Sequence, residues 1–163
     1  MGEVLAKSIT FTDDLDRKML VDGNGFKLKV TYEIEKFSKD YSIDGRFDDY
    51  QKSLLTKLND SAKSKSVITI TDEYRGRGTT YALARFAEDN DLAFVIGAHF
   101  KKGYLTDTLG FKGSIVHVNN LRGRRFENGF IVDTDVQLDK IDRYVLDQLT
   151  TGVQSLPYKT NSI

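Results

Sequence analysis

Residues 67–87 form a segment whose order of elements can bind phosphate. A β-branched run at 67–71 leads into a turn with glycine at positions 76 and 78, and apolar spacing predicts a helix from about Thr79 to Glu88. When a strand passes through a glycine-rich turn directly into a helix, backbone N–H groups and the helix N-terminus can surround an anion. Glycine pairs also occur in ordinary tight turns, so the pattern needs a second feature to be specific.

The segment resembles the Walker A motif of P-loop NTPases, in particular compact ATPases with a strand, a Gly-x-Gly-Lys-Thr-Thr turn and an Ala/Leu-rich helix. Residues 130–133 are similar to a Walker B strand, with three apolar residues ending in Asp133, and Asp135 follows closely. The resemblance covers residues 66–150. It implies an ATP site with Mg²⁺ in which Thr80 and Asp133 contact the metal and Asp135, as the catalytic acid, activates water.

The turn departs from the motif at the lysine that contacts the β- and γ-phosphates. One alignment places Gly78 on the glycine just before the lysine of the motif, so that Thr79 takes the place of the lysine and Glu73 that of the first glycine. In the other alignment the lysine position is deleted. In both alignments an arginine of the turn would have to supply the cation, because guanidinium binds phosphate bidentately. The nucleotide-binding residues that the resemblance implies are Arg75, Gly76, Arg77, Gly78, Thr79 and Thr80.

Two functions follow from this pattern. The first is a degenerate, non-catalytic P-loop-type module that binds a protein or nucleic-acid partner, which the missing lysine favours. The alternative is a small ATP-binding P-loop ATPase that uses Mg²⁺. Size and composition resemble those of phage or mobile-element accessory proteins.

A basic loop precedes the Walker B-like strand. In helicase-like and packaging-type ATPases a similar Leu-Arg-Gly-x-Arg-Phe stretch stands at this place, and here Arg122, Arg124 and Arg125 are the candidate contacts to nucleic acid or a protein partner. The simpler interpretation is a solvated loop whose arginines pair with nearby acids.

Composition excludes several other classes of protein. The 163 residues hold 24 Lys+Arg against 24 Asp+Glu and no cysteine, which argues against nucleic-acid binding by bulk charge and excludes disulfides and thiolate metal sites. Apolar runs stay far below the roughly 20 residues that cross a bilayer, and the N-terminus lacks a signal-peptide pattern. We expect a cytoplasmic protein without membrane contact; its oligomeric state stays open.

The predicted fold is a three-layer α/β domain with a mostly parallel sheet of P-loop type, preceded by an antiparallel β-hairpin and a helix. Residues 1–65 would hold the hairpin and helix on the same domain, 66–152 the core, and 153–163 a loose tail. Short apolar strands separated by helices favour a parallel sheet covered on both faces. The predicted elements of the core are strands at 67–71, 92–96, 114–118 and 129–133, helices at 79–88 and 98–109, and a final helix from Leu138 to near Gly152, with no clear strand after Asp133.

Overall fold

The computed structural model describes residues 8–12, 17–23, 28–74 and 76–156. The chain divides into two compact units between Ser38 and Lys39. In the first unit, strands β1 (Ser8–Thr12), β2 (Arg17–Gly23) and β3 (Leu28–Ile34) pair antiparallel in the order β1-β2-β3. The hairpin predicted within residues 1–65 includes residues 24–27, which lie outside the described residues.

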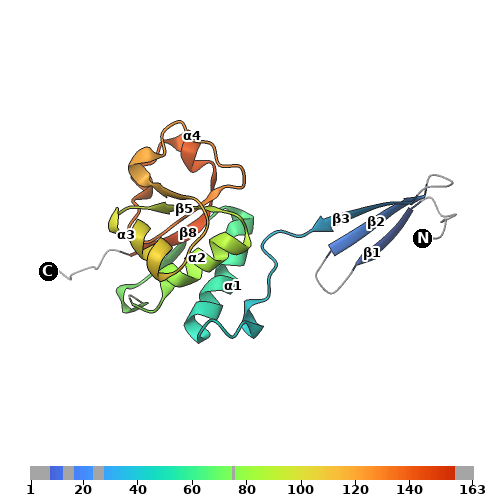
Figure 1. Cartoon of the computed structure of the whole chain (residues 1–163), viewed down its shortest axis with the longest axis horizontal. Helices are drawn as coiled ribbons and strands as arrows, with labels where there is room; N and C mark the ends of the chain where they lie inside the picture. The colour runs from blue at the N-terminus through green and yellow to red at the C-terminus, as the bar shows by residue number, and fades with distance from the viewer. Residues whose placement is uncertain (1–7, 13–16, 24–27, 75, 157–163) are drawn as a thin grey trace. The chain divides into compact units, whose positions relative to one another are not determined.

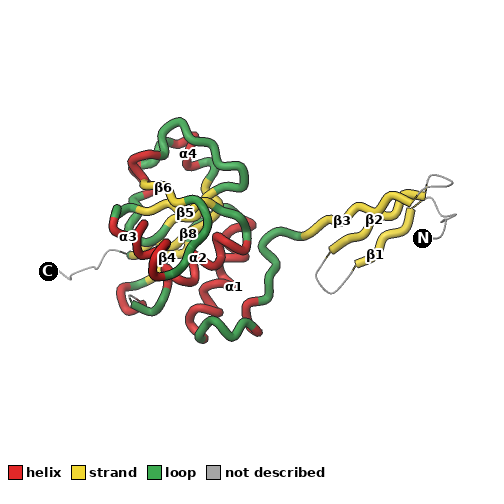
Figure 2. Tube along the Cα trace, in the orientation of Figure 1, coloured by secondary structure: helices red, strands yellow, loops and turns green. Residues whose placement is uncertain are grey.

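The second unit contains a five-stranded, entirely parallel sheet, so the prediction of an α/β fold with a mostly parallel sheet is confirmed. The strands stand in the order β4-β8-β7-β5-β6, and Figure 2 shows them in yellow among the red helices. Their bounds are β4 Ile68–Ile70, β5 Ala93–Ile96, β6 Ile115–His117, β7 Phe130–Val132 and β8 Leu149–Ser155.

Helices and short turns connect these strands (Figure 1). The longer helices are α1 (Asp49–Ser64) and α2 (Thr79–Asp89). Short segments complete the unit: η1 Tyr41–Ile43, η2 Asp72–Tyr74, α3 Phe100–Gly103, the π-helical turn η3 Tyr104–Thr108, η4 Val118–Asn120, η5 Leu138–Lys140 and α4 Arg143–Leu146.

Both faces of the sheet are covered, which is why the inner strands β5 and β7 are apolar throughout. All three residues of β7 are fully buried. On one face, α1 and α2 pack against each other and against the strands, and the buried hydroxyls of Ser61 (α1) and Thr151 (β8) lie 2.6 Å apart. On the other face, Phe130 and Val132 pack with Ile141 and other apolar residues of the segment between β7 and β8.

The compact units divide the chain between Ser38 and Lys39, whereas the sequence predicts a boundary at residue 65. Helix α1, predicted to lie on the same domain as the core, packs against α2 and β8 and belongs to the second unit. Residues 153–155, assigned to a loose tail, are the last residues of β8 and pair with β4.

The prediction of a final helix from Leu138 to near Gly152 is wrong. The structure has the one-turn segments η5 and α4 there, followed by strand β8. The apolar spacing that predicted the helix is real, since Leu138, Ile141, Val145 and Leu149 all contact one core cluster. They reach that core from separate short turns and from the start of a strand, so their burial does not need a continuous helix.

Candidate functional site

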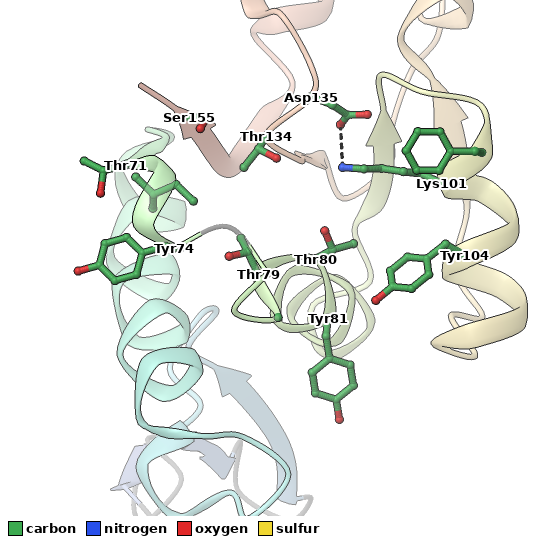
Figure 3. A pocket seen from close by; sticks show the side chains of 14 residues that line it. Thr71, Tyr74, Thr79, Thr80, Tyr81, Lys101, Tyr104, Thr134, Asp135 and Ser155 are labelled. Atoms are coloured by element: carbon green, nitrogen blue, oxygen red, sulfur yellow. Dashed lines mark ion pairs between the residues drawn. The ribbon is translucent and has the colours of Figure 1, made fainter. Parts of the chain in front are cut away.

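A cavity of about 540 Å³ opens at the carboxyl ends of the parallel strands. In sheets of this kind, ligands bind outside the carboxyl ends of the strands. The end of β4, the turn before α2, the first turn of α2, α3 and the residues after β7 line the cavity (Figure 3). The cavity therefore joins the two sequence segments that were singled out for phosphate and metal binding.

The glycine turn has the backbone that its sequence predicts. Gly76 and Gly78 have φ of +75° and +80°, a region that favours glycine. Gly78 is also the N-cap residue of α2, and no side chain caps this helix end. The first N–H groups of a helix have no partner inside it, so those of α2 are available to a bound anion.

Helix α1 supports the turn from behind. It begins with a capping box between Asp48 and Gln51, and the Gln51 amide Nε2 donates to the Gly78 carbonyl at 3.3 Å. A Cβ on Gly78 would overlap that amide nitrogen. The backbone conformation therefore favours glycine at 78, and a side chain there would also displace the Gln51 amide.

Thr80 lines the cavity and contacts Asp133, which is not among the lining residues. The Thr80 hydroxyl donates to Asp133 Oδ2 at 2.8 Å, and the Thr134 amide donates to Asp133 Oδ1 at 2.7 Å. Asp133 is fully buried. The end of the turn and the end of β7, 53 residues apart in sequence, are therefore hydrogen-bonded directly.

Lys101 on α3 is the buried cation of the site. Its Nζ lies 2.8 Å from Asp133 Oδ2 and 3.2 Å from Asp135 Oδ1, and Figure 3 shows the side chain reaching toward Asp135. Burial lowers the pKa of the ammonium, but attraction and hydrogen bonding from Asp133, followed by Asp135, outweigh it, so the pKa of Lys101 is raised. Lys101 is a positively charged group over the whole physiological pH range.

Asp135 bridges between the cavity and the sheet. Its Oδ2 accepts a hydrogen bond from the Gly97 amide after β5 at 3.0 Å, while Oδ1 faces Lys101. The oxygens of Asp133 and Asp135, together with the Thr80 hydroxyl, are hard donors of the kind that Mg²⁺ prefers. No group of three or more His, Cys, Asp or Glu suited to a metal occurs among the described residues, but Mg²⁺ typically uses only one or two carboxylates plus substrate phosphates.

Thr79, at the position of the missing lysine, faces α1. Its side chain is largely buried, and its hydroxyl lies 2.8 Å from the Tyr50 hydroxyl. The Tyr50 ring in turn stacks on Tyr74, with ring centroids 4.9 Å apart. Thr79 thus joins the glycine turn to α1.

The other predicted residues are placed differently. Arg77 is exposed and is not among the residues that line the cavity, and Arg75 lies outside the described residues. Glu73, which would oppose an anion, also stays off the lining and accepts a hydrogen bond from Thr71 at 2.9 Å.

The basic loop does not reach this cavity. Arg122 contributes to a cavity of about 450 Å³ beside His117, and Arg124 and Arg125 to one of about 250 Å³ near Asp91. All three arginines are exposed, and within the described part of the chain none forms an ion pair with a carboxylate. The structure therefore separates this loop from the glycine turn.

Comparison with known proteins identifies no relative. No family model matches the chain, and neither a curated protein nor a solved structure matches it. In the part of the chain that the structure describes, every helix is too short or too polar to cross a bilayer.

Proposed function

We propose that the chain is a degenerate P-loop-type module that binds a nucleoside triphosphate together with Mg²⁺ in the cavity at the carboxyl ends of the sheet. The observation that carries the proposal is the 2.8 Å hydrogen bond between Thr80 and Asp133. It joins a hydroxyl at the start of α2 to a buried carboxylate after β7, which are the two groups that the resemblance assigns to Mg²⁺. A large separation between them would have removed the proposal.

The anionic part of the ligand has two sources of positive potential. One is the N-terminus of α2, where no side chain among the described residues caps the helix. The other is Lys101, which lines the same cavity. Thr80 and Asp133 would hold Mg²⁺, which neutralises phosphate charge when bound. Asp135 already contacts Lys101 and Gly97, so the proposal is for binding and assigns no hydrolysis.

Aromatic side chains around the cavity favour a nucleotide over a bare phosphate. Tyr74 lines one side and Tyr104 the other (Figure 3), and Phe100 is also among the lining residues. Phe100 is 76% exposed and Tyr104 43%. Exposed rings beside a phosphate site offer faces on which a base can stack.

Titration calorimetry with Mg²⁺ and ATP tests the proposal. Wild type should bind, and Thr80→Val should weaken binding about tenfold or more, because the variant loses one oxygen ligand of the metal. Thr108→Val, which changes an exposed threonine in η3, should bind like wild type. Absence of heat with wild type at about 1 mM ATP, where even a weak complex forms, would reject the proposal.

A second variant tests the nature of the ligand. Phe100→Ala should weaken ATP binding about tenfold and leave tripolyphosphate binding unchanged, since stacking contributes roughly 1–3 kcal/mol per base. Ile43→Ala removes another exposed apolar side chain, at a residue that does not line the cavity, and should change neither affinity. Equal losses for both ligands in Phe100→Ala would argue against a base at this position. The comparison is made by the same calorimetry.

A further inference from the structure

Lys101 contacts Asp133, the carboxylate that the proposed site needs for its metal, and also the nearby Asp135. Its Nζ is within 3.2 Å of both Asp133 and Asp135, and its side chain is only 14% exposed. The neighbouring Lys102 is exposed. The burial of Lys101 is therefore specific to its place at the end of β5.

A metal ion and the Lys101 ammonium compete for the same oxygen. Asp133 Oδ2 accepts hydrogen bonds from both Thr80 and Lys101, each at 2.8 Å. Thr80 and Asp133 are also the pair proposed to hold Mg²⁺. A divalent ion on this oxygen would repel the adjacent ammonium, because like charges at such a distance interact strongly in a largely buried site. Lys101 must then leave the carboxylates.

Phosphate oxygens of a ligand in the cavity would offer Lys101 a second set of partners. Among the described residues that line it, Lys101 carries the only basic side chain. Its flexible four-carbon stem can place the charge at different points along the cavity. Phosphate oxygens held by the glycine turn would be the nearest new negative charges.

We propose that Lys101 is a tethered cation that neutralises Asp133 and Asp135 in the ligand-free chain and moves to the phosphates when nucleotide and metal bind. It would thereby replace, from a different segment, the lysine that the glycine turn lacks. This inference rests on the proposed function and adds the residue that completes the site. Lys101 would therefore take the place of the metal beside the carboxylates in the ligand-free chain and contact the phosphates when nucleotide and metal are bound.

The test uses Lys101→Met, which removes the charge and keeps most of the length, and measures two affinities by calorimetry. Mn²⁺ alone should bind about tenfold more tightly or better than to wild type, because the carboxylates lose their competing cation. ATP with Mg²⁺ should bind about tenfold more weakly or worse. A role in folding alone would not move these two affinities in opposite directions. The matched control, Lys102→Met, should leave both unchanged.

The outcomes separate this inference from the proposed function. If wild type binds no nucleotide, the proposed function fails, and so does the movement of Lys101 to phosphate. The Mn²⁺ measurement then still decides whether Lys101 competes with metal. If nucleotide binds but Lys101→Met changes neither affinity, the inference is overturned while the proposed function stands.

If Lys101→Met does not fold, a measurement on the wild-type protein tests the inference instead. The rate of acetylation of each lysine is followed by mass spectrometry with and without ATP and Mg²⁺. Lys101 should change its rate at least about threefold when it changes partners, whereas exposed Lys102 should not. An unchanged rate at Lys101 under saturating nucleotide would contradict the inference.

Discussion

Replacing Asp133 with alanine is expected to lower the free energy of unfolding by about 3 kcal/mol and to abolish Mg²⁺-dependent nucleotide binding. Asp133 is fully buried and accepts hydrogen bonds from Thr80, Lys101 and the Thr134 amide. Removing one partner of a buried ion pair leaves the other charge uncompensated, which typically costs about 3–5 kcal/mol. We take the lower end because Lys101 keeps Asp135. Urea unfolding followed by circular dichroism measures the change.

Two further variants test whether the loss of stability comes from the pairing of Asp133 with Lys101. Asp139→Ala removes an exposed carboxylate in η5 and should change the free energy of unfolding by no more than about 0.5 kcal/mol. In the double variant Asp133→Ala/Lys101→Met, the unpaired ammonium is gone, so much of the loss should be recovered. If the losses of the two single variants simply add, Asp133 and Lys101 are not coupled.

Gly97→Ala is expected to destabilise the second unit by about 2–3 kcal/mol and to weaken nucleotide binding. A Cβ at Gly97 would overlap the Asp135 backbone oxygen and lie 2.8 Å from its carbonyl carbon. Backbone atoms cannot turn aside as a flexible side chain can, so β5 and the segment after β7 must separate. That movement breaks the 3.0 Å hydrogen bond from the Gly97 amide to Asp135 and displaces a partner of Lys101.

Gly45→Ala is the matched control. A Cβ at Gly45 meets nothing within 4 Å, and its φ does not lie in the left-handed region. The same change of residue should therefore be neutral or slightly stabilising in unfolding experiments. If Gly97→Ala and Gly45→Ala behave alike, the close approach at Gly97 does not matter for stability.

The sequence predicted four of the five parallel strands because each is a compact apolar run. It did not predict β8, because Leu149–Ser155 contains two threonines, a glycine and a glutamine. Its polar residues and its glycine make contacts in the folded sheet that composition does not reveal. Thr151 is fully buried and donates to the Ser66 carbonyl, and Gly152 lets the backbone approach Val132 closely.

The candidate site was predicted in part. The glycine turn, Thr80 and both aspartates were named from the sequence, and the structure brings Thr80 and Asp133 together. A role for Lys101 was not predicted, because nothing in the sequence distinguishes Lys101 from Lys102. The position of α3 brings the Lys101 side chain to Asp133 and leaves Lys102 exposed. Thr79 carries a contact to Tyr50 that depends on α1, 29 residues earlier in the chain.

Two expectations from the sequence stay predictions. Partner or nucleic-acid binding by the arginine loop depends on residues that lie apart from the proposed nucleotide cavity. Activation of water by Asp135 would need its carboxylate freed from Lys101 and the Gly97 amide.

The order of the strands sets a condition on how the site is assembled during folding. In the sheet, β8 stands between β4, which leads into the glycine turn, and β7, which leads to Asp133. It is also the last of the described strands along the chain, and β4 pairs with no other described strand. The contact between Thr80 and Asp133 therefore depends on a segment that is synthesised after both of them. Such non-local pairing slows folding and keeps the edges of β4 and β7 exposed until β8 is in place.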